Sequence, residues 1–263
     1  MNLIRSIWAT TLFEIKRSFS VQRVLVAAIL AGFPPAMVTV ITIAGRRSGD
    51  QLPLDNLLII ILVSIVGLLS QLLWATPNVY TELEGKSWIF IASRPRGRIS
   101  LFLGKYLSAV AFSFAVCFIA ISLCLGIRTY ALTTQVNPAK TWLAMNSAML
   151  LACFSYSAIF SVIGTLFQKR AMVFGAAYII LSEAILANVP AIISRFTARF
   201  HLQAIAADWL GWFHPIPEEQ FRMIFGDTST AFHLTCLISA IIILLAIGCT
   251  IVTARQYITA EEA

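Results

Sequence analysis

The stretch LFLGKYLSAVAFSFAVCFIAISLCLGI, from Leu101 to Ile127, carries a single charged residue, Lys105. An α-helix needs about 20 mostly apolar residues to cross roughly 30 Å of hydrocarbon at 1.5 Å per residue. The stretch is long enough, and a helix satisfies its own backbone hydrogen bonds, as lipid requires. This segment therefore predicts a membrane-spanning helix, which sets the fold class of the chain around it.

Similar apolar stretches occur on both sides of this one. Together they predict an all-α, polytopic integral membrane protein with six transmembrane helices, over Gln22–Ala44, Leu54–Tyr80, Leu101–Ile127, Thr141–Phe167, Ala171–Asn188 and Ala231–Ala254. Intramembrane polar residues are expected to pack helices or bond between them: Gln71, Asn146, Ser155, Ser157 and Ser161.

The composition supports this class. The chain of 263 residues is 59% hydrophobic and only 12% charged, and soluble domains carry about twice that charged fraction. No polar segment is long enough for a soluble catalytic domain of about 100 residues. We therefore predict one membrane domain over residues 1–263, without catalytic residues and without a metal site, since the histidines and cysteines lack metal-ligand spacing.

The distribution of the 19 Lys and Arg residues predicts the orientation. With both termini in the cytoplasm, twelve of them lie on the inner side and seven on the outer side, as the positive-inside rule favours. The net charge of +7 then fits anionic lipid at the inner face, and no basic face with interleaved aromatic residues indicates nucleic acid.

Two nonspanning segments have amphipathic character. Residues 1–20 contain the predicted helix Leu3–Phe19, with apolar residues on one side and Glu14 and Arg17 on the other, and we expect it to lie in the inner interface. Residues 189–230 form an outer loop with short interfacial helices, which would act either as an anchor or as a gate.

The cytoplasmic loop over residues 81–100 is the most informative segment. It runs from Glu82 and Glu84 through a short apolar run to a stop at Pro95 and Gly97. The string Gly85-Lys86-Ser87 copies only the end of a phosphate-binding P-loop, because Tyr80 stands where the first glycine belongs. The pattern predicts a short helix at the membrane surface, of a length that suits docking into another protein.

This loop resembles the coupling-helix loop of the ABC export permeases of the type 2 membrane-domain family. Glu82 and Glu84 match the acids of that loop, and Ser87 stands at its Thr position. Ser93-Arg94-Pro95, Arg98 and Leu103-Gly104-Lys105 match its later part, while Lys86 departs from it, because the glycine here comes one position earlier. The likeness covers nearly the whole chain.

The resemblance implies a permease subunit that forms a translocation pathway with a second copy or a homologue. Two separate cytoplasmic ATPase subunits would bind ATP and Mg, and this chain would hold no cofactor. It also favours the bacterial inner membrane. The residues expected to couple to the ATPase are Glu82, Glu84, Lys86, Ser87, Trp88, Ile89, Phe90, Ser93, Pro95 and Arg98.

Glu183 is the one carboxylate in the middle of a predicted span. A charged group facing lipid is costly, so its side chain should face the bundle interior, a partner helix or a cavity. It would serve either in a structural hydrogen bond or in the pathway. Two alternatives stay open for the chain: a membrane-integral enzyme or proton-linked carrier that uses Glu183, and an anchoring or assembly subunit that moves no solute.

Overall fold

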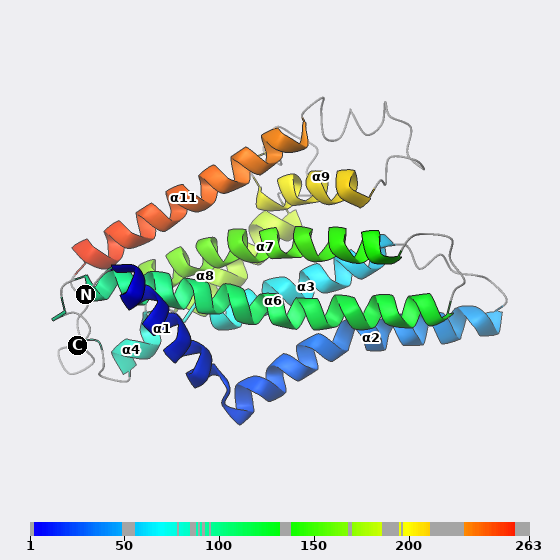
Figure 1. The fold of residues 1–263 in the computed structure, drawn as a ribbon, viewed down its shortest axis with the longest axis horizontal. Coiled ribbons are helices and arrows are strands. Elements are labelled where there is room, and N and C mark those ends of the chain that lie inside the picture. Colours follow the sequence, from blue (N-terminus) through cyan, green and yellow to red (C-terminus); the bar gives the residue numbers. More distant parts are fainter. Residues whose placement is uncertain are drawn as a thin grey trace.

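The computed structural model describes residues 3–48, 56–77, 79–84, 88, 90, 93–94, 96–131, 138–167, 170–185, 195, 197–210 and 229–255. Within these ranges the secondary structure is helical and contains no strand. The helices run lengthwise through an elongated bundle, with α1 crossing it obliquely (Figure 1). The all-α prediction is therefore confirmed.

In the first part of the chain, the described residues form α1 (Leu3–Ser18), α2 (Val21–Ser48), α3 (Asn56–Trp74) and α4 (Tyr80–Glu84). The second part forms α6 (Gly97–Ala131), α7 (Pro138–Leu166), α8 (Ala171–Tyr178), a π-helix η1 (Ile179–Ile185), α9 (Ala198–Leu210) and α11 (Thr230–Ala254).

Among the residues that the structure describes, four helices are long and apolar enough to cross a membrane, which indicates a membrane protein. They are Val21–Ala44, Gly97–Tyr130, Pro138–Leu166 and Thr230–Ala254, and they coincide with the first, third, fourth and sixth predicted spans. At the other two predicted positions lie shorter apolar helices, Ile60–Trp74 and Ala171–Ser182.

The predicted second span was too long at its carboxyl end. We predicted Leu54–Tyr80, whereas α3 ends at Trp74 and residues 75–77 form a turn. Pro77 explains the difference, since a proline disfavours helical geometry in the residue before it and cannot donate a backbone hydrogen bond. The next helix, α4, begins at Tyr80. The predicted single helix is therefore two helices joined by a bend, and the bend brings Glu82 toward the bundle.

Successive long helices run in opposite directions. The start of α6 meets the end of α11, where Arg98 donates a hydrogen bond to the Thr253 carbonyl at 3.0 Å. Arg255 donates to the Leu166 carbonyl at 2.7 Å, which brings in the end of α7. We call this end of the bundle, which also holds α4, the α4 end; the start of α1 and the end of α11 both lie there (Figure 1).

The core lies where α3, α6 and α7 meet. Phe160 and Cys117 are fully buried there. Gln71 of α3 donates to the Cys153 carbonyl at 3.4 Å and accepts a hydrogen bond from the Ser157 hydroxyl of α7. These bonds confirm, for Gln71 and Ser157, the prediction that intramembrane polar groups join neighbouring helices.

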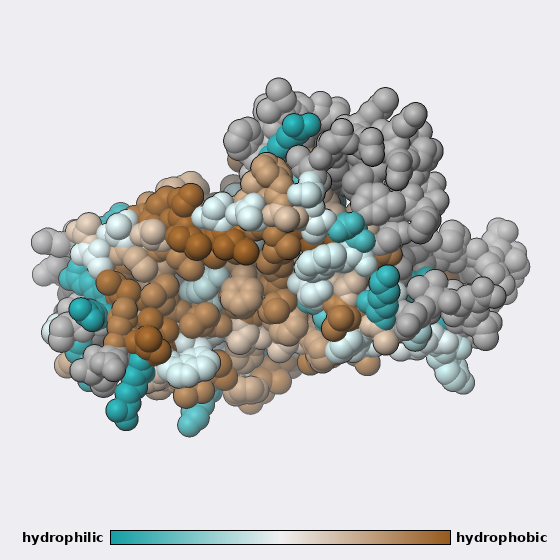
Figure 2. All heavy atoms as spheres, turned by 45° about the horizontal axis from the view of Figure 1, so that its top comes forward, coloured by the Kyte–Doolittle hydropathy of each residue, from teal (hydrophilic) through white to brown (hydrophobic). Residues whose placement is uncertain are grey.

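On the face shown in Figure 2, apolar residues gather across the middle and hydrophilic residues lie mainly toward the ends. Helix α1 is close to its predicted extent, and its apolar residues Ile4, Trp8, Leu12 and Phe13 are exposed. Its buried side chains are polar, namely Thr11, Glu14 and Ser18. The helix therefore turns its polar side toward the bundle and its apolar side outward, an arrangement suited to lipid surroundings.

Candidate functional site

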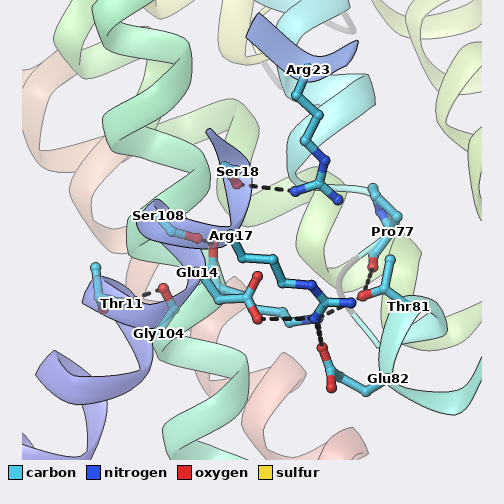
Figure 3. Close-up of polar contacts among 11 residues, drawn as sticks. Thr11, Glu14, Arg17, Ser18, Arg23, Pro77, Thr81, Glu82, Gly104 and Ser108 are labelled. Carbon is cyan, nitrogen blue, oxygen red and sulfur yellow. Dashed lines mark hydrogen bonds and ion pairs between the residues drawn. The ribbon is translucent and has the colours of Figure 1, made fainter. Parts of the chain in front are cut away.

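Four charged side chains from three helices meet at the α4 end. Arg17 of α1 donates to Glu82 Oε1 at 2.8 Å, and Lys105 Nζ of α6 lies 2.8 Å from the same oxygen. Figure 3 shows Arg17 and Glu14 on α1 pointing toward Glu82 on α4. Glu14 Oε1 lies 3.7 Å from Arg17 and 3.9 Å from Lys105. We call Glu14, Arg17, Glu82 and Lys105 the charged cluster.

The charged cluster is largely removed from solvent. The side chains of Glu14, Glu82 and Lys105 are 9%, 5% and 7% exposed, while Arg17 is 41% exposed. Burying a charge is expensive unless an opposite charge and hydrogen bonds compensate it. The two acids and two bases supply that compensation only while α1, α4 and α6 keep their positions, so the cluster ties the three helices together.

Neighbouring hydroxyl groups complete the polar environment. Lys105 Nζ also bonds to the Thr81 hydroxyl at 2.7 Å, and Thr81 donates to the Pro77 carbonyl at 3.1 Å. Arg23 of α2 donates a hydrogen bond to the hydroxyl of Ser18, the last residue of α1, at 3.0 Å (Figure 3). The turn after α3 and the junction between α1 and α2 thus belong to the same polar region.

Gly104 allows α1 to reach the cluster. A Cβ at this position would lie 2.7 Å from Thr10 Cβ and 3.2 Å from the Ile7 carbonyl oxygen. The Thr11 hydroxyl lies within hydrogen-bond distance of two carbonyl oxygens: that of Gly104 on α6, at 3.3 Å, and that of Ile7 on its own helix, at 2.9 Å. The absence of a side chain therefore brings the two backbones close enough for Glu14 and Arg17 to meet Lys105.

Trp88 anchors the segment after α4 to the body of the bundle. Its side chain is 3% exposed and packs with Val79, Phe102 and Val252. The Arg98 guanidinium lies 5.8 Å from the centre of the Trp88 ring, a cation–π distance. Because Phe102 belongs to α6 and Val252 to α11, a displacement of Trp88 would act on both helices.

Phe90 has the opposite environment from Trp88, two positions away. Its side chain is 74% exposed. The Ser93 hydroxyl donates to the Phe90 carbonyl at 3.1 Å, and Ser93 and Arg94 are exposed as well. The segment therefore has one aromatic residue fixed in the bundle and another presented outward.

The structure does not place every predicted coupling residue. Glu82, Trp88, Phe90, Ser93 and Arg98 are brought together at the α4 end as described above. Glu84 is the last residue of α4, but its side chain lies outside the described part. Outside the described residues altogether are Lys86, Ser87, Ile89 and Pro95.

Glu183 lies in the π-helix η1. Its side chain is outside the described part, so neither of the two predicted roles is tested. In the part of the chain that the structure describes, no three or more His, Cys, Asp or Glu side chains gather to hold a metal ion.

Sequence reasoning missed the partners of Glu82. It placed Lys105 only in the Leu103-Gly104-Lys105 triplet, and Glu14 and Arg17 only on the polar side of the first helix. One signal was present: Lys105 is the lone charge inside an otherwise apolar stretch, and such a charge requires a partner. The residues next to Lys105 in the sequence did not indicate which acid that partner would be.

Models of known protein families and a set of curated proteins were compared with the chain, and none matches it.

Proposed function

We propose that the chain is the permease subunit of an ATP-binding cassette exporter, with its ATPase in separate subunits. The observation that carries this proposal is the pairing of Trp88, buried between α6 and α11, with Phe90, which is 74% exposed. Such a segment can receive a partner on its outer side and pass a displacement to the helices on its inner side. The likeness of residues 81–105 to the coupling loop of type 2 ABC permeases supports the same function.

Two routes would transmit a displacement of this segment. One runs through Trp88 to Phe102 and Val252, and so to α6 and α11. The other runs from α4 through Glu82 to Lys105 of α6 and Arg17 of α1. Both routes use packed side chains or short ion pairs, and chains of such contacts can carry energetic coupling between distant sites.

The proposal includes six spans and two cytoplasmic termini. The alternating directions of α2, α3, α6, α7, α8–η1 and α11 support six crossings, with the shorter apolar helices as the second and fifth. An even number returns the chain to the side on which it began. The α4 end would then face the cytoplasm, in a bacterial inner membrane, where it would meet the ATPase.

The chain itself would make or break no covalent bond. ATP and Mg would be bound by the partner ATPase, and the pathway would be shared with a second copy of the chain or a homologue. Helix α1 would lie at the inner interface with Trp8 and Phe13 toward lipid, which agrees with their exposure.

The test uses the purified complex of this chain with its ABC ATPase in lipid vesicles. Phe90→Ala should lower stimulated ATP hydrolysis about tenfold, because an exposed aromatic anchor at an interface contributes on the order of 1.4 kcal/mol or more. Tyr130→Ala is the matched control, since Tyr130 is 93% exposed at the far end of α6. Equal stimulation by the wild type and Phe90→Ala would contradict the proposal.

One observation favours a second function, a proton-linked carrier that uses Glu183. This residue lies in a seven-residue π-helix, and π-helical turns are frequent at functional sites. In that case Glu183→Gln would abolish flux driven by a proton gradient in vesicles without ATP. Flux that requires ATP and survives Glu183→Gln would decide for the exporter.

A further inference from the structure

A second site lies away from the charged cluster, between α7, α8, α9 and α11. It is a cavity of about 530 Å³, within the range of small-molecule sites. Its walls include Ile159 of α7, Tyr178 of α8, Phe200 of α9, and Leu237 and Ile241 of α11. Those coupling residues whose side chains the structure describes do not line it.

One end of the cavity is polar. His201 Nδ1 of α9 and His233 Nδ1 of α11 lie 2.8 Å apart, and the Arg195 backbone hydrogen-bonds His201. Two Nδ1 atoms at this distance share one proton, so one ring donates and the other accepts. Burial lowers the pKa of His201 below its ordinary value, so this ring is neutral at neutral pH and the fixed charge at this end belongs to Arg195.

The rest of the cavity is mainly apolar. It follows α11 from His233 to Leu244, about 16 Å at 1.5 Å per residue. The hydroxyls of Ser155 and Ser239 line this part, but each donates to a carbonyl of its own helix, Leu151 and Cys236, at 2.9 Å. Polar recognition is therefore concentrated at the Arg195 and histidine end.

The lining residues also have a one-sided charge. They include Arg195 and no Asp or Glu, among the residues that the structure describes. Asp208, the acid of α9, accepts a hydrogen bond from Thr230 and is not part of the lining. A cation at one end and an apolar channel along a helix match a molecule with an acidic head and a hydrocarbon tail.

We propose that this cavity binds an acyl chain with an anionic head, the head at Arg195 and the histidine pair and the tail along α11 toward Leu244. A free fatty acid and an acidic phospholipid share this chemistry. The site stands independently of the exporter function, because it uses none of the residues at the α4 end.

The experiment uses the full-length chain in nanodiscs of neutral lipid that contain palmitate with a diazirine on its tail. After illumination, mass spectrometry should find label on α11 between Leu237 and Leu244. Excess palmitate should suppress this label, and hexadecanol, which has the same tail without the charge, should not. Label spread evenly over exposed apolar helix faces, or equal suppression by hexadecanol, would overturn the proposal.

Matched variants separate recognition from folding. Arg195→Gln should lower the label about tenfold, because it removes one charge-assisted hydrogen bond. Arg5→Gln, at an exposed arginine of α1, should leave it unchanged. Ile241→Trp fills the cavity and should abolish the label, whereas Ile242→Trp changes the neighbouring residue, which is 62% exposed and outside the lining. Unchanged label in both Arg195→Gln and Ile241→Trp would refute the site.

A parallel sample with diazirine-labelled phosphatidic acid distinguishes the two sources. Label from palmitate alone identifies a fatty acid as the ligand, and label from phosphatidic acid identifies a membrane phospholipid. Absence of specific label from both would overturn the proposal.

Discussion

At the scale of single residues, Glu82 is the central acid of the charged cluster. One of its oxygens accepts hydrogen bonds from both Arg17 and Lys105 at 2.8 Å. Lys105 is 7% exposed, and if Glu82 were neutral its acidic neighbour among the described side chains would be Glu14, at 3.9 Å. Among the contacts of the cluster, the pairing of Glu82 with Lys105 should therefore contribute most to the free energy of unfolding.

We predict that Glu82→Gln destabilises the protein by about 3 kcal/mol, the order expected when one partner of a buried pair is removed. The measurement is denaturant unfolding of the purified protein in detergent. Adding Lys105→Met should recover much of the loss, because no unpaired buried charge remains. Lys140→Met, at an exposed lysine of α7, serves as the control. A double variant no more stable than Glu82→Gln would contradict this account.

His201 gives a pH dependence whose sign follows from its environment. Burial lowers its pKa below 6.5 in the folded protein, so the unfolded chain binds a proton at a higher pH than the folded one. More protons on the unfolded chain mean that stability rises with pH. The stability associated with neutral His201 is thus present above pH 6.5 and is lost as the pH falls below this value.

The measurement is the melting temperature in detergent at about pH 7.5 and about pH 5.5. We expect the wild type to lose stability between these values and His201→Gln to lose less, because the substituted side chain does not titrate. Identical losses in the two proteins would show that the imidazole at 201 is not responsible.

At the scale of elements, the attachment of α1 depends on one close approach. Thr11, Glu14 and Ser18 face the bundle, and Gly104 leaves the space that Thr10 and Ile7 occupy. A helix with an apolar outer side has no hydrophobic reason to stay on the bundle in lipid, so close packing and polar contacts must hold it.

Gly104→Val should therefore displace α1 from α6. A cysteine placed at Thr11, which is 2% exposed, should react with a maleimide much faster in the Gly104→Val background than without it. Gly126→Val is the matched control in the same helix, since a Cβ there would meet no atom of the described residues within 4 Å. Equal reaction rates in the Gly104→Val and Gly126→Val proteins would exclude this role of the glycine.

At the scale of the whole molecule, the arrangement separates two ends. Phe90 lies at the α4 end and Tyr130 at the opposite end of α6, and their side chains are 74% and 93% exposed. Because α6 is long enough and apolar enough to cross the bilayer between them, they should lie on opposite sides of the membrane.

The measurement introduces Phe90→Cys or Tyr130→Cys into a background without the five native cysteines. In intact cells, a membrane-impermeant maleimide should label the cysteine at 130 and reach the one at 90 only after lysis. Labelling of both in intact cells would contradict a crossing by α6, and the reverse pattern would invert the proposed orientation.

Part of this organisation could be predicted from the sequence and part could not. The spans predicted at Thr141–Phe167 and Ala231–Ala254 lie on the helices Pro138–Leu166 and Thr230–Ala254. They were predicted because bilayer thickness sets how many consecutive apolar residues a span needs, which is a local property. The end of α3 at Trp74 was missed because no charged residue occurs between it and Glu82, while the turn before Pro77 depends on backbone geometry.

The side of α1 that faces the bundle is a different case. Its pattern has one apolar and one polar side, and the pattern alone allows either to face inward. The space at Gly104 and the buried charge of Lys105 decide that the polar side does.

By itself, then, the sequence determined that this is a helical membrane protein and where its longest apolar helices lie. Only the tertiary structure decided that Glu82 pairs with Lys105 and Arg17, and that His201 meets His233 beside an apolar cavity. The reason is physical: hydropathy acts over consecutive residues, whereas ion pairs and cavities depend on distances between atoms that are far apart along the chain.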